Sequence, residues 1–367
     1  MSINRLKSHM QEILSGADVE IDGCRPWDIT VHDESVYSCV LRQGSVGLGE
    51  SYMDGSWDCK ALDQFFCKVF IAGIDRRAAR SWPAIRLFMK SLFCNPQTKS
   101  RSTKVAKEHY DLGNDLFQYM LDQRMVYTCG KWENAGNLNE AQEAKLDFVC
   151  RKLELMPGMK VLDIGCGWGS FPKFAAEKYG VQVTGITLSR RQLELGRTLC
   201  AGLPVELRIA DYRDLHESFD RIVSLGMFEH VGSQNYRTFF NVAHRSLRNG
   251  GKMFLATIGS NTSVRMTDPW IERYIFPNSH VPSTKQIEAA LRGRFLVQEW
   301  QNWGTYYDRT LMAWFNNVET NWDKLKAIYS ERFHRMWSFY LLASAGSFRS
   351  HRLQVWQISL SRDGTGR

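Results

Sequence analysis

Residues 161–170 read V-L-D-I-G-C-G-W-G-S, and this stretch decides the expected fold. Apolar, strand-forming residues run directly into glycines at 165, 167 and 169, and an apolar and aromatic stretch continues to Tyr179. The pattern predicts a buried parallel strand, a tight glycine turn and the start of a helix. Because glycine has no Cβ, a ligand can lie directly against the backbone of such a turn.

The spacing of these glycines differs from the dinucleotide-binding fingerprint. The protein has G-x-G-x-G preceded by Asp163, whereas the fingerprint is G-x-G-x-x-G. The turn resembles the first motif of class I S-adenosylmethionine (SAM) methyltransferases, and this resemblance implies a SAM site. The alternative is a glycine turn that holds no ligand.

Segments typical of strands and helices alternate through the rest of the chain, as in an α/β fold. The expected helices include 190–201 and 235–247, and the expected strands are 160–164, 182–186, 206–210, 221–225, 252–257, 296–299 and 355–360. We therefore expect an α/β protein with a seven-stranded, mostly parallel, doubly wound sheet and a smaller, mainly helical N-terminal domain. The resemblance of the glycine turn implies that this sheet has the class I SAM-dependent methyltransferase fold. Ligands of such sheets bind at the carboxyl ends of the strands.

A polar, proline-containing stretch at 95–103 is the best candidate for a linker between domains. We expect residues 1–98 to form an N-terminal lipid- or membrane-associated domain and residues 99–367 to form the catalytic domain. A chain of 367 residues is long enough for a large core and a second, smaller domain.

The formal net charge of +8 is concentrated in one segment. Residues 75–107 contain nine basic residues and one acid, a difference equal to the whole excess. Within this segment, residues 82–93 place apolar side chains at helical spacing, with basic side chains on another face. Such a helix can lie on anionic lipid, or it can pack on its own domain. No recognised nucleic-acid-binding motif accompanies the charge, so we expect no nucleic-acid partner.

The cysteines and the first residues indicate the compartment. Nine cysteines stand singly and no C-x-x-C occurs, which argues against a disulfide framework or a zinc site, so we expect no bound metal. No apolar run of about 18 residues could span a bilayer, and the first residues lack a signal-peptide core. We expect a cytoplasmic protein, peripheral on the inner face of the cytoplasmic membrane.

Polar side chains follow the second and third expected strands. The segment 187–192 supplies hydroxyls and an amide, and 211–214 reads D-Y-R-D. Taken alone, the first segment could simply cap a helix and the second could be a charged loop. Their order after successive strands favours cofactor binding, with the second segment placed at the adenine edge.

Several further motifs carry a resemblance that extends through nearly the whole sequence. They are G-L-G-E-S-Y-M-D-G (47–55), E-H-Y-D-L-G-N-D-L-F (108–117), G-M-F-E-H-V-G (226–232), T-I-G-S (257–260), D-P-W-I (268–271), R-Y-I-F-P-N (273–278) and T-L-M-A-W (310–314). On these the protein resembles the cyclopropane-fatty-acyl-phospholipid synthases, relatives of the mycolic acid cyclopropane synthases. The resemblance implies that the SAM methyl is transferred to a cis double bond of an unsaturated phospholipid at the membrane surface, followed by proton loss and ring closure. The oligomeric state stays open, with a homodimer as one alternative.

The resemblance also assigns site residues. Those for SAM are Tyr127, Thr128, Gly165, Cys166, Gly167, Thr187, Leu188, Ser189, Gln192, Tyr212 and Arg213. The family's proton acceptor is a bicarbonate ion, whose ligands map onto Cys129, Glu229, Tyr307 and the backbone amide of Ile258. The structural alternatives are a buried small hydrophobe for Cys129 and a core aromatic for Tyr307. A carboxylate repels an anion unless a proton lies between them, so Glu229 should bond the bicarbonate hydroxyl or be protonated.

Two positions depart from the family pattern. Ala256 replaces a histidine ligand of bicarbonate, a loss of about 1.5–3 kcal/mol for a hydrogen bond to an anion. Water or His230 could replace that imidazole, although we favour a structural role for His230. Ser344 replaces a cysteine sometimes marked catalytic, but methyl transfer to an alkene needs no thiolate.

These departures leave alternatives for the product. One is a C-methyltransferase that acts on acyl chains and gives a methyl-branched or methylene product. Another is an inactive relative that binds lipid or SAM. Bicarbonate stays in doubt because of Ala256.

Overall fold

The computed structural model describes residues 2–75, 113–263 and 267–362. The expected linker at 95–103 and nearly all of the basic segment therefore lie outside the described residues. The protein divides into two compact units. The helical unit comprises Met1–Cys94, Asp268–Ile275 and Tyr307–Leu353, and the sheet unit comprises Asn95–Thr267, Phe276–Tyr306 and Gln354–Arg367.

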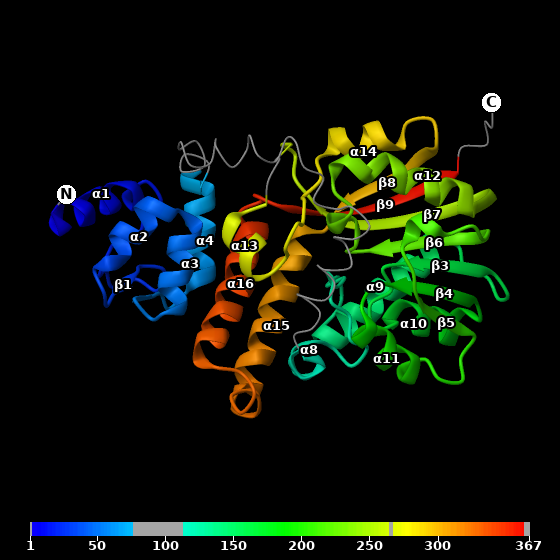
Figure 1. Cartoon of the computed structure of the whole chain (residues 1–367), viewed down its shortest axis with the longest axis horizontal. Coiled ribbons are helices and arrows are strands. Elements are labelled where there is room, and N and C mark those ends of the chain that lie inside the picture. Colours follow the sequence, from blue (N-terminus) through cyan, green and yellow to red (C-terminus); the bar gives the residue numbers. More distant parts are fainter. Residues whose placement is uncertain (1, 76–112, 264–266, 363–367) are drawn as a thin grey trace. The chain divides into compact units, whose positions relative to one another are not determined.

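The sheet unit contains a seven-stranded sheet in the order β5-β4-β3-β6-β7-β9-β8 (Figure 1). Its strands are β3 (Lys160–Ile164), β4 (Gln182–Thr187), β5 (Val205–Ile209), β6 (Phe219–Leu225), β7 (Leu247–Gly259), β8 (Phe295–Asn302) and β9 (Gln354–Arg362). Among these described strands, β9 runs in the opposite direction to the other six and pairs antiparallel with β7 and β8. The expected mostly parallel, doubly wound sheet is confirmed, and β7 begins earlier than predicted, directly after the preceding helix.

Helices cover both faces of this sheet. They are α8 (Asn114–Met120), α9 (Leu138–Lys152), α10 (Ser170–Tyr179), α11 (Arg190–Leu199), α12 (Tyr236–Ser246) and α14 (Thr284–Leu291). Side chains alternate along the buried strands, so Leu162 packs with α12 and α14, whereas Val161 packs with α9 and α10. Among the described residues, the short 3-10 turns η1 (Tyr212–Asp214) and η2 (Phe228–His230) follow β5 and β6, and η3 (Ser233–Asn235) lies between η2 and α12.

The helical unit is built from three separate parts of the sequence. It contains α1 (Ile3–Ser15), α2 (Ser35–Gln43), α3 (Ser45–Met53), α4 (Leu62–Ile71), α13 (Pro269–Tyr274), α16 (Glu331–Arg349) and most of α15 (Gly304–Leu325), with a short ladder of β1 (Thr30–Val31) and β2 (Trp57–Asp58). Helix α16 packs on α3 and α4, and an added Cβ at Gly346 would lie 2.6 Å from the carbonyl oxygen of Asp63. The N-terminal segment thus shares its core with C-terminal helices, rather than folding as the continuous 1–98 domain that we expected.

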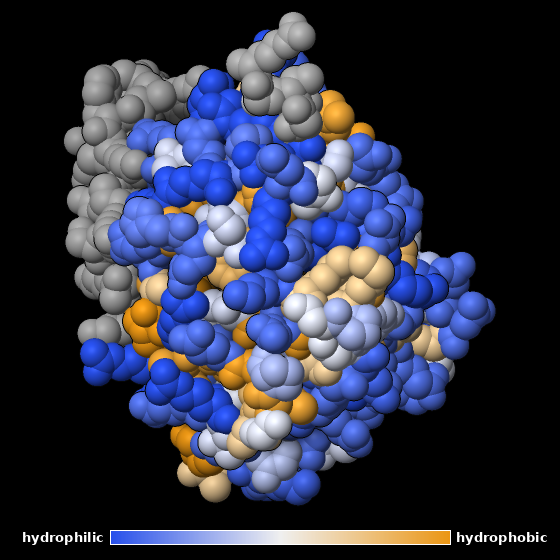
Figure 2. Space-filling model, turned by 90° about the vertical axis from the view of Figure 1, so that its right-hand side faces the viewer, coloured by the Kyte–Doolittle hydropathy of each residue, from blue (hydrophilic) through white to orange (hydrophobic). Residues whose placement is uncertain are grey.

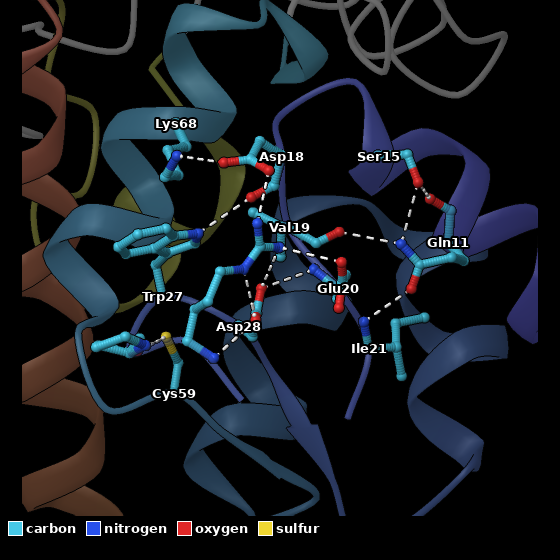
Figure 3. A network of polar contacts seen from close by, with 12 residues as sticks. Gln11, Ser15, Asp18, Val19, Glu20, Ile21, Trp27, Asp28, Cys59 and Lys68 are labelled. Carbon is cyan, nitrogen blue, oxygen red and sulfur yellow. Dashed lines mark hydrogen bonds and ion pairs between the residues drawn. The ribbon is translucent and has the colours of Figure 1, made fainter. Parts of the chain in front are cut away.

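A polar network fixes the loop after α1 (Figure 3). Buried Asp28 accepts hydrogen bonds from the Arg25 guanidinium at 2.9 Å and from the backbone N–H of Glu20 at 2.8 Å. Asp18, at a positive φ of 54°, pairs with Arg25 and with Lys68 of α4. These bonds connect the loop to α4 within the helical unit.

The apolar residues of the described helices and surface bear on contact with lipid. None of the helices in the described ranges combines the length and apolarity that crossing a bilayer requires. Figure 2 shows a predominantly hydrophilic face on which apolar side chains form separate patches. The large exposed apolar residues of the sheet unit are Tyr119, Met156, Ile209, Leu296 and Val297. Scattered residues of this kind are ordinary for a folded surface.

Candidate active site

A cavity of about 190 Å³ lies in the sheet unit, and the glycine turn after β3 forms part of its wall. Gly165, Gly167 and Gly169 have φ values of 89°, 54° and 84°, in the region that favours glycine. An added Cβ at Gly165 would lie 2.6 Å from the Met227 side chain, whereas one at Gly167 would meet no atom within 4 Å. The turn therefore needs glycine for its conformation, and Gly167 leaves open space beside the backbone.

The residues that the sequence assigned to SAM gather around this cavity. Its lining includes Tyr127, Thr128, Gly165, Cys166, Gly167, Thr187, Leu188, Ser189, Gln192, Tyr212 and Arg213. They come from the segment after α8, from the turn after β3, from the end of β4 with the start of α11, and from η1. The structure brings all of these positions together.

The polar residues after β4 both cap a helix and line the cavity. Ser189 is the N-cap of α11, and its hydroxyl accepts a hydrogen bond from the Gln192 backbone N–H at 3.3 Å. The Thr187 hydroxyl donates to the Gln192 side-chain oxygen at 2.9 Å. The helix-cap interpretation is therefore correct for Ser189, and it does not exclude a place in the cavity wall.

Asp211, which follows β5, orients the Arg213 side chain in the wall of the cavity. The Arg213 guanidinium donates to both carboxylate oxygens of Asp211, at 2.8 and 2.6 Å. Burial raises the pKa of the neighbouring Tyr212 to about 12, so its hydroxyl stays protonated near neutral pH. This edge of the cavity offers an aromatic ring beside a fixed ion pair.

Two buried ionisable residues in the cavity wall were missing from the predicted site. Lys145 of α9 donates a hydrogen bond to the Thr128 hydroxyl at 2.8 Å, and burial lowers its pKa to about 8. Burial raises the pKa of Asp163 to about 8, and its Oδ1 has no hydrogen-bond partner among the described residues. Lys145 is spaced four residues from both Ala141 and Val149, on the apolar face of the helix. A lysine in such a position is the sequence signal that could have identified it.

Glu229 and Ile258 meet at the carboxyl ends of β6 and β7. The Ile258 backbone N–H donates to Glu229 Oε1 at 2.6 Å, and Oε2 has no partner in the described parts of the protein. Glu229 is 8% exposed. Burial raises the pKa of its carboxyl to about 7, against the opposing effect of the Ile258 N–H. The group can therefore gain or lose a proton near neutral pH.

The other predicted catalytic residues lie in different surroundings. Cys129 is buried in the sheet unit, with its thiol 3.7 Å from the Trp303 carbonyl oxygen. Tyr307 of α15 and Ser344 of α16 belong to the helical unit. The Tyr307 ring packs against Phe348 and Trp314, with centroids 4.8 and 5.8 Å away, as a core aromatic would.

Ala256 stands where the resemblance predicts a histidine ligand of bicarbonate, and His230 is one candidate to replace that imidazole. Ala256 is buried in an apolar cluster with Val223 and Phe254. His230 lines the cavity, and burial lowers its pKa to about 4, so the imidazole is neutral near neutral pH. In the described ranges, no group of three or more His, Cys, Asp or Glu residues is placed to hold a metal ion.

Comparison with known proteins gives a consistent set of matches. The family model described as mycolic acid cyclopropane synthetase matches residues 97–358. The protein is 48% identical over 352 residues to the cyclopropane-fatty-acyl-phospholipid synthase of Escherichia coli, a match to 96% of this chain and 92% of that protein. It is 36% identical over 280 residues to a probable fatty acid methyltransferase of Pseudomonas putida, a match to 72% of this chain and 71% of that protein.

Solved structures agree in fold. The cyclopropane synthase MmaA2 from Mycobacterium tuberculosis matches with a TM-score of 0.67 and 32% identity, covering 71% of this chain and 98% of that one. The mycolic acid cyclopropane synthase CmaA1 complexed with SAH and CTAB matches with a TM-score of 0.66 and 34% identity, with the same coverage of 71% and 98%.

Proposed function

Because the chain belongs to the mycolic acid cyclopropane synthetase family, we propose that it converts cis double bonds of unsaturated phospholipid acyl groups into cyclopropane rings, with SAM as the methylene donor. The protein has the class I SAM-dependent methyltransferase fold. The observation that carries the proposal is that all the residues assigned to SAM line the same cavity.

The cavity suits a cationic co-substrate with a long polar body. The open backbone at Gly167 allows close approach, and the free Oδ1 of Asp163 offers an acceptor. Aromatic faces such as Tyr127 and Trp168 can favour a sulfonium by about 0.5–2 kcal/mol. SAM supplies the transferred methyl, and these residues bind and orient it.

Glu229 supports the proton-removal step. After methyl transfer the lipid carries a positive charge, and loss of a proton allows the ring to close. A buried carboxyl with a free oxygen and a pKa of about 7 is suited to take that proton, directly or through a bound bicarbonate. Bicarbonate would have no imidazole at Ala256, and the Ile258 N–H already donates to Glu229.

The test uses the purified full-length protein, SAM and vesicles that contain cis-unsaturated phospholipid. We expect acyl groups heavier by one CH2 group, with cyclopropane ring protons in the upfield window of the proton NMR spectrum. Glu229→Gln should bind SAM normally and lose turnover, whereas the exposed control Glu12→Gln should keep both. SAM binding without any acyl product would refute the proposal.

A second candidate product follows from Ala256. If bicarbonate is not held, the cation can rearrange by a hydride shift and lose another proton, which gives a methyl-branched or methylene product. The same NMR spectrum distinguishes these products, because branched methyl and vinyl protons lie outside the cyclopropane window.

We further propose that the protein acts as a peripheral protein on the inner face of the cytoplasmic membrane, with residues 1–98 contributing the lipid-associated part. The basic segment at 75–107 supports this, because each Lys or Arg near an anionic surface contributes about 1 kcal/mol. Sedimentation with anionic vesicles at low salt, and release at high salt, is the expected result. Light scattering would decide between a monomer and a homodimer.

A further inference from the structure

Three neighbouring buried residues at Glu229 each carry a polar side-chain atom that has no partner among the described residues. These atoms are Oε2 of Glu229, the hydroxyl oxygen of Tyr236 and Nε2 of His280, and none has a hydrogen-bond partner among the residues that the structure describes. The residues are 8%, 2% and 7% exposed. All three belong to the sheet unit.

Several contacts establish that the three residues are neighbours. The His280 backbone N–H donates to the Glu229 carbonyl oxygen at 2.8 Å. The Tyr236 and His280 ring centroids lie 6.1 Å apart. The Tyr236 ring is held by stacking on Phe228, with centroids 4.3 Å apart. The three residues are therefore neighbours that come from η2, from α12 and from the loop before α14.

Leaving such buried atoms unpaired is costly, because each loses its hydrogen bonds to water and gains none in the protein. A fold that keeps three of them in one place therefore indicates a function for the site. Their chemistry is complementary, because a protonated carboxyl donates, a phenol both donates and accepts, and a neutral imidazole nitrogen accepts. The arrangement has the donor and acceptor types of a proton relay with bound water.

We propose that Tyr236 and His280, together with water bound between them and Glu229, form a relay that removes the proton from Glu229 after each turnover. The inference rests on the proposed function, in which one proton leaves the lipid in each cycle. The O–H bond of protonated Glu229 breaks and an N–H bond forms at Nε2 of His280. Glu229 becomes a carboxylate and His280 an imidazolium, with no change in oxidation state, and the imidazolium then loses its proton to solvent.

Because burial raises the pKa of the Glu229 carboxyl and lowers the pKa of His280, the transfer is uphill, so the imidazolium forms only transiently and passes its proton on. Burial lowers the pKa of His280, and the hydrogen bond to Gln286 of α14 opposes this effect, so the ring is neutral and able to accept near neutral pH. The other titratable group next to Glu229 on η2 is His230, which is also neutral near neutral pH. From β7, Glu229 faces the Ile258 amide and the Thr257 hydroxyl, neither of which titrates.

The test compares Tyr236→Phe and His280→Gln with the full-length wild type in the vesicle assay. We expect kcat to fall about 10-fold in each variant and the solvent isotope effect in D2O to rise, with an unchanged KM for SAM. Tyr37→Phe is the matched control, because Tyr37 is a buried tyrosine of the helical unit and lies outside the proposed relay. It should keep the wild-type kcat.

The outcomes separate the relay from the proposed function. If wild type forms the ring product and both relay variants keep its kcat and isotope effect, the relay is wrong and the function stands. A fall in kcat that follows a fall in melting temperature or in SAM affinity would identify a structural role instead, and would overturn the relay. If wild type makes no product, the relay is tested by carbon NMR titration of the Glu229 carboxyl. His280→Gln should then change the apparent pKa of that carboxyl, and an unchanged pKa would refute the coupling.

Discussion

Gly167→Ala tests whether the open space beside the glycine turn is where the co-substrate lies. Gly167 has a φ of 54°, and an added Cβ would meet no protein atom within 4 Å. The substitution therefore places a methyl group in the cavity without a clash in the free protein. Its only cost to folding is the positive φ, about 1–2 kcal/mol.

Gly158→Ala is the matched control for that conformational cost. Gly158 has a φ of 81°, its added Cβ also meets nothing within 4 Å, and it does not line the cavity. Both variants should lose about 1–2 kcal/mol of stability, a fall of roughly 2–4 °C in melting temperature for each kcal/mol. A difference between them in SAM binding therefore reports on the cavity alone.

Calorimetric titration with SAM and thermal unfolding measure the two effects separately. We expect Gly167→Ala to weaken SAM binding about 10-fold or more, equivalent to at least about 1.4 kcal/mol, because the new methyl occupies the place of ligand atoms. Gly158→Ala should bind SAM like wild type. Equal SAM affinity in both variants would show that the ligand does not approach Gly167, and would refute this use of the turn.

Four further predictions concern charge and close contacts. Burial raises the pKa of the Glu229 carboxyl from 4.5 to about 7, so between these pH values the folded protein binds a proton that the unfolded protein has lost. The free energy of unfolding should therefore fall as the pH rises from 4.5 to about 7. Glu229→Gln should reduce this pH dependence, measured by urea unfolding. Turnover needs the carboxylate, so kcat should rise with pH through about 7. Gly259→Ala should cost about 1–3 kcal/mol or more in urea unfolding, because its Cβ would lie 2.1 Å from the buried Trp356 ring. Arg349→Met should cost about 1–2 kcal/mol in the same assay, because it leaves the carboxylates of Asp63 and Asp308 without their shared cation.

The cofactor edge of the sheet could be predicted because its information is local. A strand, a glycine turn and a helix start follow one another within residues 160–179, and their order fixes which strand ends face the ligand. Lys145 lies outside that pattern. It reaches Thr128 from the middle of α9, and only the packed structure places it in the cavity wall.

The composition of the helical unit could not be predicted from the sequence, because it depends on contacts between distant segments. Residues 331–349 form helix α16, and its own sequence does not show which core that helix joins. Phe339 of α16 packs against Phe66 of α4, with ring centroids 5.0 Å apart. Contacts between segments so distant in sequence leave no local pattern. The expected boundary at the 95–103 linker therefore assigned α16 to the catalytic domain, whereas α16 belongs to the helical unit.

The replacement at Ala256 connects the site to the proposed relay. The family's imidazole would stand on β7, but here that position belongs to an apolar cluster and offers no hydrogen bond. If no bicarbonate is held there, the lipid proton passes to Glu229, and the buried carboxyl needs a route by which to lose it. His280, from a different segment, is held next to Glu229 by a backbone hydrogen bond, and Tyr236 stands between a stacked aromatic ring and the His280 ring. The protein that lacks a histidine on β7 thus keeps a histidine of another segment next to Glu229.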